Sequence, residues 1–248
     1  MNDYTIQTKQ LIDELKAICT SNGLGNDGNE FKIITQVFLY KYLNDKFMHE
    51  IKLADPKLHN AGNVEAILQN YSDDDYEMML MSLHPSAARL KREHFLSFLA
   101  GHANDDDFHK RFDDTLADIG RFNEAIFSIK TDSGAKVVLF DELSQFITDP
   151  SKRDGFCRAI IARLTEFSFE HVFDAGYDFF ATIFEYLIKD YNKDGGGKYA
   201  EYYTPHAVAR IMSAILVEGN PTNVKVYDPS AGSGNLLMSN AHAIGDDK

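Results

Sequence analysis

The sequence predicts a mainly helical N-terminal part followed by the start of an α/β domain. Apolar residues recur at helical spacing through most of the chain as far as residue 167. A short run rich in β-forming residues, 224–227, then stands directly before Asp228-Pro229. A glycine loop and a further helical pattern follow this run. Strand, glycine loop and helix in this order are typical of the first unit of a doubly wound α/β domain.

The helical part begins with an amphipathic pattern over residues 4–19, which Asn22-Gly23 is expected to end. The next pattern, over residues 31–47, is apolar nearly all round, so we expect it to form the buried centre of a helical domain. A β-prone run over residues 135–140 has no role that the sequence indicates. Further helices are predicted over residues 64–68, 76–83, 87–99, 108–129, 142–147 and 151–167.

At 248 residues and 44% hydrophobic content, the chain can bury a substantial core in one large or two modest domains. We place a helical domain at residues 1–168 and the start of the α/β domain at residues 169–248. No apolar run approaches the roughly 18 residues of a membrane-spanning helix, and the N-terminus has no signal-peptide pattern. We therefore expect a cytoplasmic protein without a membrane partner. Cys19 and Cys157 fall in helical patterns and are expected to be buried hydrophobes.

The net charge of −13, from 38 acidic residues against 25 lysines and arginines, argues against a chain that binds DNA tightly by itself. Arg89, Lys91 and Arg92 form the clearest basic cluster, which is either a contact for DNA or a partner, or a solvated face. Two acidic runs, 73–75 and 105–107, lack the spacing of a calcium loop. We expect these runs to be solvated helix caps, and no metal site is predicted.

The glycine loop, residues 230–234, has almost no side-chain bulk, so a ligand can lie directly against its backbone amides. Asn235 then begins the second helical pattern, whose N-terminus offers free N–H groups and the positive end of a helix dipole. The dinucleotide fingerprint needs a third glycine where Leu237 stands, and the phosphate-loop tripeptide Gly-Lys-Ser/Thr is absent from the loop. Neither of those two sites is therefore favoured.

A second signal lies upstream, in the segment Glu201-Tyr202-Tyr203-Thr204-Pro205. Thr204 suits an N-cap, and Pro205 suits the first position of a helix that continues to residue 216. The two tyrosines place aromatic surface and hydroxyl groups immediately before that helix. A capped helix with no further role is the alternative interpretation.

Together the two segments resemble the N6-adenine DNA methyltransferases, in which Phe/Tyr-Thr-Pro precedes a loop that reads Asp-Pro-x-x-Gly-Ser-Gly. The chain is most similar to the modification subunit of type I restriction-modification systems. Residues 173–188 are similar to that family's helix before the Tyr-Thr-Pro motif, and residues 38–43 to a run in its N-terminal helical domain. The chain departs from the family at Ser230-Ala231, where many relatives carry Ala-Cys, and at Asn235-Leu236, where Gly-Phe is common.

This resemblance implies a Rossmann-like domain that binds S-adenosyl-L-methionine. It also implies assembly with a DNA specificity subunit, a second modification subunit and a restriction subunit, so that DNA is held by the assembled complex. The residues that the resemblance assigns to the cofactor are Glu201, Tyr202, Tyr203, Thr204, Pro205, Asp228, Pro229, Ser230, Gly232, Ser233, Gly234 and Asn235.

The family's catalytic motif, Asn/Asp-Pro-Pro-Phe/Tyr, does not occur in the sequence, which has no Pro-Pro pair. No catalytic residue is therefore assigned. We expect the chain to be the N-terminal part of a methyltransferase subunit that transfers no methyl group by itself. Two alternatives stay open: a non-catalytic helical interaction module, or part of a fused restriction-modification enzyme of the same chemistry.

Overall fold

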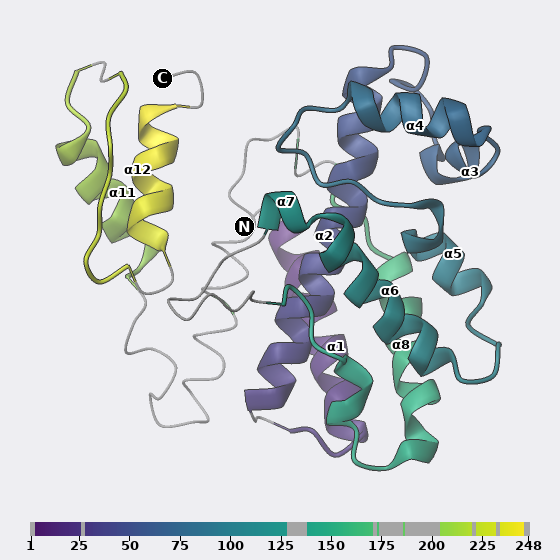
Figure 1. Cartoon of the computed structure of the whole chain (residues 1–248). Coiled ribbons are helices and arrows are strands. Elements are labelled where there is room, and N and C mark those ends of the chain that lie inside the picture. Colours follow the sequence, from purple (N-terminus) through teal and green to yellow (C-terminus); the bar gives the residue numbers. More distant parts are fainter. Residues whose placement is uncertain are drawn as a thin grey trace. The chain divides into compact units, whose positions relative to one another are not determined.

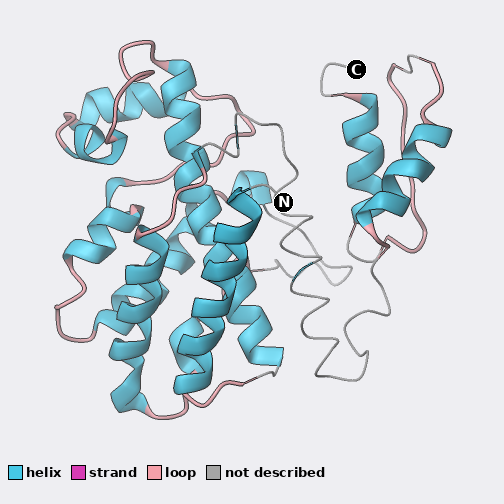
Figure 2. Ribbon diagram, turned by 180° about the vertical axis from the view of Figure 1, so that it is seen from behind, coloured by secondary structure: helices cyan, strands magenta, loops and turns pink. Residues whose placement is uncertain are grey.

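The computed structural model describes residues 3–25, 28–127, 138–170, 204–219, 222–231 and 234–245, together with Phe173 and Tyr186. The chain forms two compact units, residues 1–177 and 178–248, and each is described by itself below. Over the described residues all regular structure is helical, as Figure 2 shows. The boundary placed between residues 168 and 169 stays a prediction.

The two N-terminal helices follow the sequence patterns closely. Helix α1 (Asp3–Ser21) ends where Gly23 takes a φ of +87°, a conformation that glycine adopts without strain. The N–H of Leu24 donates to the carbonyl of Cys19 at 3.0 Å and closes this end. Helix α2 (Gly28–Ala54) is the long central helix predicted from its apolar residues. Its fully buried side chains include Ile33, Ile34, Val37, Phe38, Tyr40, Phe47 and Ile51.

The remaining elements of the helical unit are shorter. They are α3 (Val64–Gln69), α4 (Asp73–Ser82), η1 (Arg92–His94), α5 (Leu96–Gly101), α6 (Phe108–Phe122), α7 (Glu124–Phe127), η2 (Leu143–Phe146), η3 (Pro150–Lys152) and α8 (Arg153–Thr165). The acids of the run 73–75 are exposed and lie in the first turn of α4. They are solvated as predicted, but the residue that caps the helix is Ser72. Of the β-prone run, residues 138–140 are described and form a loop.

Some predicted helices are divided in the structure. The helix predicted over residues 87–99 forms only in its second half, as η1 and α5. Residues 87–91 are a loop, in which the N–H of Arg89 donates to the side chain of Asn123 at 2.7 Å and not to a carbonyl of its own turn. The helix predicted from residue 108 divides at Asn123 into α6 and α7. The amide of Asn123 also donates to the carbonyls of Arg89 and Ile119, so this one side chain ends one helix and holds a distant loop.

The core of the helical unit is built around α8, which contacts α1, α5 and α6 (Figure 1). Cys157 on α8 and Cys19 on α1 are fully buried, and burial raises the pKa of the Cys157 thiol. Both cysteines are the buried hydrophobes that the sequence predicted. In the part of the chain that the structure describes, no cluster of His, Cys, Asp and Glu side chains could hold a metal ion. No described helix combines the length and the apolar character that crossing a membrane requires.

The C-terminal unit contains two described helices, α11 (His206–Leu216) and α12 (Asn235–Ile244), which pack side by side (Figure 1). Residues 222–231 connect toward α12 as a loop. The strand predicted at 224–227 is not formed in this structure, and the described residues show no start of a sheet. A strand needs a neighbouring strand to bond its backbone, and the described residues provide none. Val224 and Val226 accordingly remain almost half exposed.

Candidate cofactor site

The acid before the glycine loop organises the turn that follows it. One carboxylate oxygen of Asp228, Oδ1, accepts the backbone N–H of Ser230 at 2.8 Å, across Pro229. The other oxygen, Oδ2, is buried and has no hydrogen-bond partner among the described residues. A buried carboxylate oxygen without a donor is costly. Asp228 therefore presents one oxygen that is committed to the turn and one that a ligand donor would satisfy.

The loop ends at Gly234, which has a φ of +78° and precedes the first residue of α12. Its N–H donates to the carbonyl of Ala231 at 2.7 Å, so the left-handed conformation closes the turn. No side chain of the described residues caps α12. The first N–H groups of this helix are thus open to an anionic group. Gly232 and Ser233 lie outside the described residues.

The helix that follows the Thr-Pro segment begins one residue later than predicted, at His206 and not at Pro205. Pro205, with φ −53° and ψ 137°, occupies the N-cap position, and α11 begins at His206. The extended ψ of Pro205 keeps it out of the helix, while its carbonyl accepts the N–H groups of Val208 and Ala209. Thr204 is therefore not the N-cap, which corrects that part of the prediction. Residues 201–203 lie outside the described part of the chain.

One hydrogen bond joins the two predicted motifs. The side-chain amide of Asn235 donates from Nδ2 to the carbonyl oxygen of Thr204 at 2.5 Å. Asn235 is only 8% exposed. The structure thus brings Thr204 and Pro205 together with the beginning of α12, across 31 positions of sequence. The sequence assigned Asn235 to the cofactor, but its side chain contacts the other motif.

The basic cluster of the helical unit is largely used inside that unit. Lys91 Nζ donates to Asp118 Oδ2 at 2.6 Å. Arg92 donates to Asp73 Oδ1 at 2.8 Å and to the carbonyls of Tyr71 and Ser72. Its guanidinium also lies 4.6 Å from the ring centre of Tyr76. These contacts fix the entry to α4. They favour a structural role for Lys91 and Arg92 over contact with DNA.

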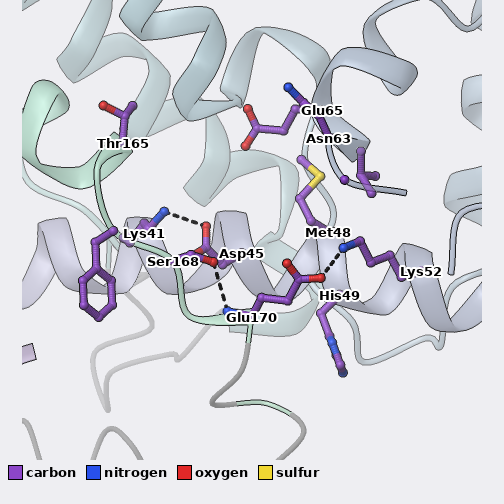
Figure 3. A pocket seen from close by; sticks show the side chains of 13 residues that line it. Lys41, Asp45, Met48, His49, Lys52, Asn63, Glu65, Thr165, Ser168 and Glu170 are labelled. Carbon is purple, nitrogen blue, oxygen red and sulfur yellow. Dashed lines mark hydrogen bonds and ion pairs between the residues drawn. The ribbon is translucent and has the colours of Figure 1, made fainter. Parts of the chain in front are cut away.

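A pocket of about 220 Å³ in the helical unit lies between α2, the start of α3 and the chain after α8 (Figure 3). Lys41 pairs there with Asp45 at 2.9 Å and Lys52 with Glu170, while Glu65 accepts a hydrogen bond from the amide of Asn44 at 2.8 Å. Asp45 also accepts the N–H of Phe169 at 2.9 Å, and burial raises its pKa. The contacts of Lys52 with Glu170 and of Asp45 with Phe169 fasten the segment after α8 to α2. Because the charged groups are satisfied within the protein, the pocket offers a ligand little to bind.

Comparison with known proteins bears on the C-terminal unit. Residues 175–248 match the model of the N-6 DNA Methylase family. The resemblance to N6-adenine DNA methyltransferases is confirmed. Both motifs of the candidate site lie within the matched residues.

A curated relative agrees with that assignment. The chain is 31% identical over 71 residues to the methylase subunit of the type I restriction enzyme MpnII from Mycoplasma pneumoniae. The aligned part is 29% of this chain and 13% of the relative, so the chain spans a small part of the relative's length. No solved structure matches the chain.

Proposed function

We propose that this chain is part of a site-specific DNA N6-adenine methyltransferase subunit of a type I restriction-modification system, and that its C-terminal unit binds S-adenosyl-L-methionine. The observation that carries the proposal is the Asn235–Thr204 hydrogen bond, which brings the Thr-Pro segment to the start of α12. The family match over residues 175–248 supports the reaction class. When bound, the cofactor supplies an electrophilic methyl group for the amine of a target adenine.

The described residues fit the amino-acid end of this cofactor. The unpartnered oxygen of Asp228 suits an ammonium group, and the open N–H groups of α12 suit a carboxylate. Gly234 leaves the backbone bare at the loop, since no described atom apart from its chain neighbours and the backbone of its own helix lies within 4 Å of the position that a Cβ would occupy. We assign the same role to the other loop and motif residues named from the sequence, including Glu201, Tyr202, Tyr203, Gly232 and Ser233.

The C-terminal unit also carries surface that suits a Rossmann-like sheet. One face of α11 exposes apolar side chains, while its buried residues are Ala209 and Ser213. The apolar stripe of α11 consists of Val208, Ile211, Met212, Ile215 and Leu216, which are 39–72% exposed. A stripe of this width normally packs against a sheet. We propose that residues 224–227 become a strand beneath this stripe when neighbouring strands are present.

The partners follow from charge and from the relative. A chain with a net charge of −13 has little attraction for DNA phosphates. The relative is described as the methylase subunit of a type I restriction enzyme. We therefore propose that a specificity subunit brings the DNA, and that a second modification subunit and a restriction subunit complete a cytoplasmic complex.

Replacing Asp228 tests the proposed function most directly. In the intact protein, Asp228→Asn keeps an oxygen for the Ser230 N–H but loses the negative charge and the second acceptor. A charge-assisted hydrogen bond contributes about 1.5–3 kcal/mol. We expect the affinity for S-adenosyl-L-methionine, measured by calorimetry, to fall roughly ten- to a hundredfold.

Glu218→Gln is the matched control, because Glu218 is an exposed acid of the same unit and its loss changes the net charge equally. The control should bind like the wild type. Equal affinities of Asp228→Asn and Glu218→Gln would remove Asp228 from the site. A wild-type protein that binds no cofactor and transfers no tritiated methyl group to unmethylated DNA, even with its specificity subunit, would contradict the proposed function itself.

A further inference from the structure

We infer that Asn235 is a positioning residue, whose side-chain amide holds the Thr-Pro segment in register with the N-terminus of α12 and so preorganises the cofactor site. This inference rests on the proposed function. It assigns to Asn235 a contact within the protein, in place of the direct cofactor contact expected from the sequence.

The peptide bond between Thr204 and Pro205 explains why such a residue is needed. Proline has no N–H, so this peptide can be fixed by hydrogen bonding only through the carbonyl of Thr204. The carbonyl of Pro205 is already used, since it accepts the N–H groups that begin α11. Asn235 Nδ2 meets the Thr204 carbonyl at 2.5 Å. Within the described residues, this bond therefore sets the orientation of the Thr204–Pro205 peptide.

The position of Asn235 couples that orientation to the loop. Asn235 is the first residue of α12 and follows Gly234, whose left-handed turn ends the glycine loop. Its side chain is directed to Thr204, which leaves the backbone N–H groups at the start of α12 available for a ligand. A shift of the Thr204 peptide would thus be transmitted to the helix end that faces the cofactor. Preorganisation of this kind raises affinity by removing the cost of ordering on binding.

Other polar side chains of α11 and α12 are also buried. Ser213 on α11 and Asn240 on α12 are buried, and their Oγ and Oδ1 atoms lack partners in the described part of the chain. By contrast, the amide of Asn235 has a specific partner outside its own helix. Asn240 therefore serves as a matched control: a buried amide on α12 for which no contact with Thr204 is found.

The test uses two substitutions in the intact protein. Asn235→Asp keeps the shape but sets a carboxylate oxygen against the Thr204 carbonyl, which replaces attraction by repulsion. Asn235→Ala removes the donor and leaves the part-buried Thr204 carbonyl without this partner. We expect each variant to bind S-adenosyl-L-methionine about tenfold more weakly than the wild type, whereas Asn240→Ala binds within twofold of it.

The pH dependence separates positioning from a general effect on folding. Burial and the facing Thr204 carbonyl disfavour the ionised form, so the pKa of the carboxyl in Asn235→Asp should rise above the usual value of about 4. Protonation then restores an O–H donor to Thr204, so the affinity of this variant relative to the wild type at the same pH should recover between about pH 8 and pH 5. Asn235→Ala has no such group and should show no recovery. Thermal unfolding without cofactor, followed at both pH values, checks that each variant is folded under the binding conditions.

The possible outcomes separate the two proposals. Wild-type affinity in both Asn235 variants would overturn the positioning role and leave the proposed function intact. Weaker binding by Asn235→Asp and Asn235→Ala with no pH recovery, or equal weakening by Asn240→Ala, would assign the effect to packing between the helices and also overturn it. A wild-type protein that fails to bind the cofactor would overturn the proposed function and this inference together.

Discussion

His94 shows how one buried polar residue organises the helical unit. Its ring is 1% exposed, and Nδ1 accepts the N–H of Lys91 at 3.1 Å. The proton therefore sits on Nε2, which donates to Asp118 Oδ2 at 2.8 Å. Burial lowers the pKa of His94. Burial acts to raise the pKa of Asp118, but the hydrogen bonds that Lys91 and His94 donate to its carboxylate outweigh this effect and hold that pKa at about 2.

These pKa shifts predict that acid destabilises the helical unit. The folded state disfavours the imidazolium form of His94. The contribution of neutral His94 to the free energy of unfolding is therefore complete above the usual histidine pKa of about 6.5, and it is lost as the pH falls toward the lowered pKa of the folded state. The ionised carboxylate of Asp118 also stabilises the folded state, and this stabilisation is lost as the pH falls from about 4 toward 2. The free energy of unfolding, from urea titrations at pH 7.5 and 5.5, should therefore decrease with acidification.

His94→Gln isolates the histidine's part of this effect. An amide can accept the Lys91 N–H and donate to Asp118 but does not titrate, so the variant should lose much of the difference between pH 7.5 and 5.5. His84→Gln is the control, since His84 is exposed and its Nδ1 contacts only Ser86 in the described structure. An identical pH dependence in wild type and His94→Gln would show that His94 is not the group responsible.

At the scale of elements, the sequence predicted what depends on local pattern and failed where distant contacts decide. α1 and α2 follow from apolar spacing and from Gly23, all of which are near in sequence. Residues 87–91 of the predicted 87–99 helix form a loop held by Asn123, which is more than thirty positions away. The sequence around residues 87–91 contains no pattern that predicts this loop. Likewise the 224–227 run has strand composition, but strand formation depends on partners that the described residues lack.

The apolar stripe of α11 yields a prediction at this scale. If a sheet covers it in the intact protein, Ile215→Gln should lower the free energy of unfolding by about 2 kcal/mol or more, although Ile215 is 72% exposed in this structure. Arg210→Gln, an exposed substitution on the same helix, should change it by less than about 0.5 kcal/mol. Chemical denaturation of both variants makes the comparison. Equally small effects would mean that the stripe faces solvent and that the proposed sheet does not cover it.

The candidate site marks the limit of sequence reasoning for the molecule as a whole. Residue types at fixed spacing identified Asp228, Gly234 and the Thr-Pro segment as one constellation, and the structure joins the last two through Asn235. The sequence could not reveal the Asn235–Thr204 contact, because it depends on how α11 and α12 pack. The one-position error at Thr204 arose because proline is compatible with both the N-cap and the first helical position, and only its ψ angle decides.

Net charge gives the last prediction, which concerns the whole chain. Affinity for duplex DNA comes largely from releasing counterions as lysines and arginines neutralise phosphates. This chain has 25 such residues against 38 acids, and Lys91 and Arg92 of its clearest basic cluster bind Asp118 and Asp73. The chain alone should therefore bind a fluorescent duplex weakly in anisotropy titrations at physiological salt. With the specificity subunit, binding should become tight and should weaken steeply between about 50 and 200 mM salt. The specificity subunit alone is the control, and tight binding by the chain alone would contradict the view that a partner brings the DNA.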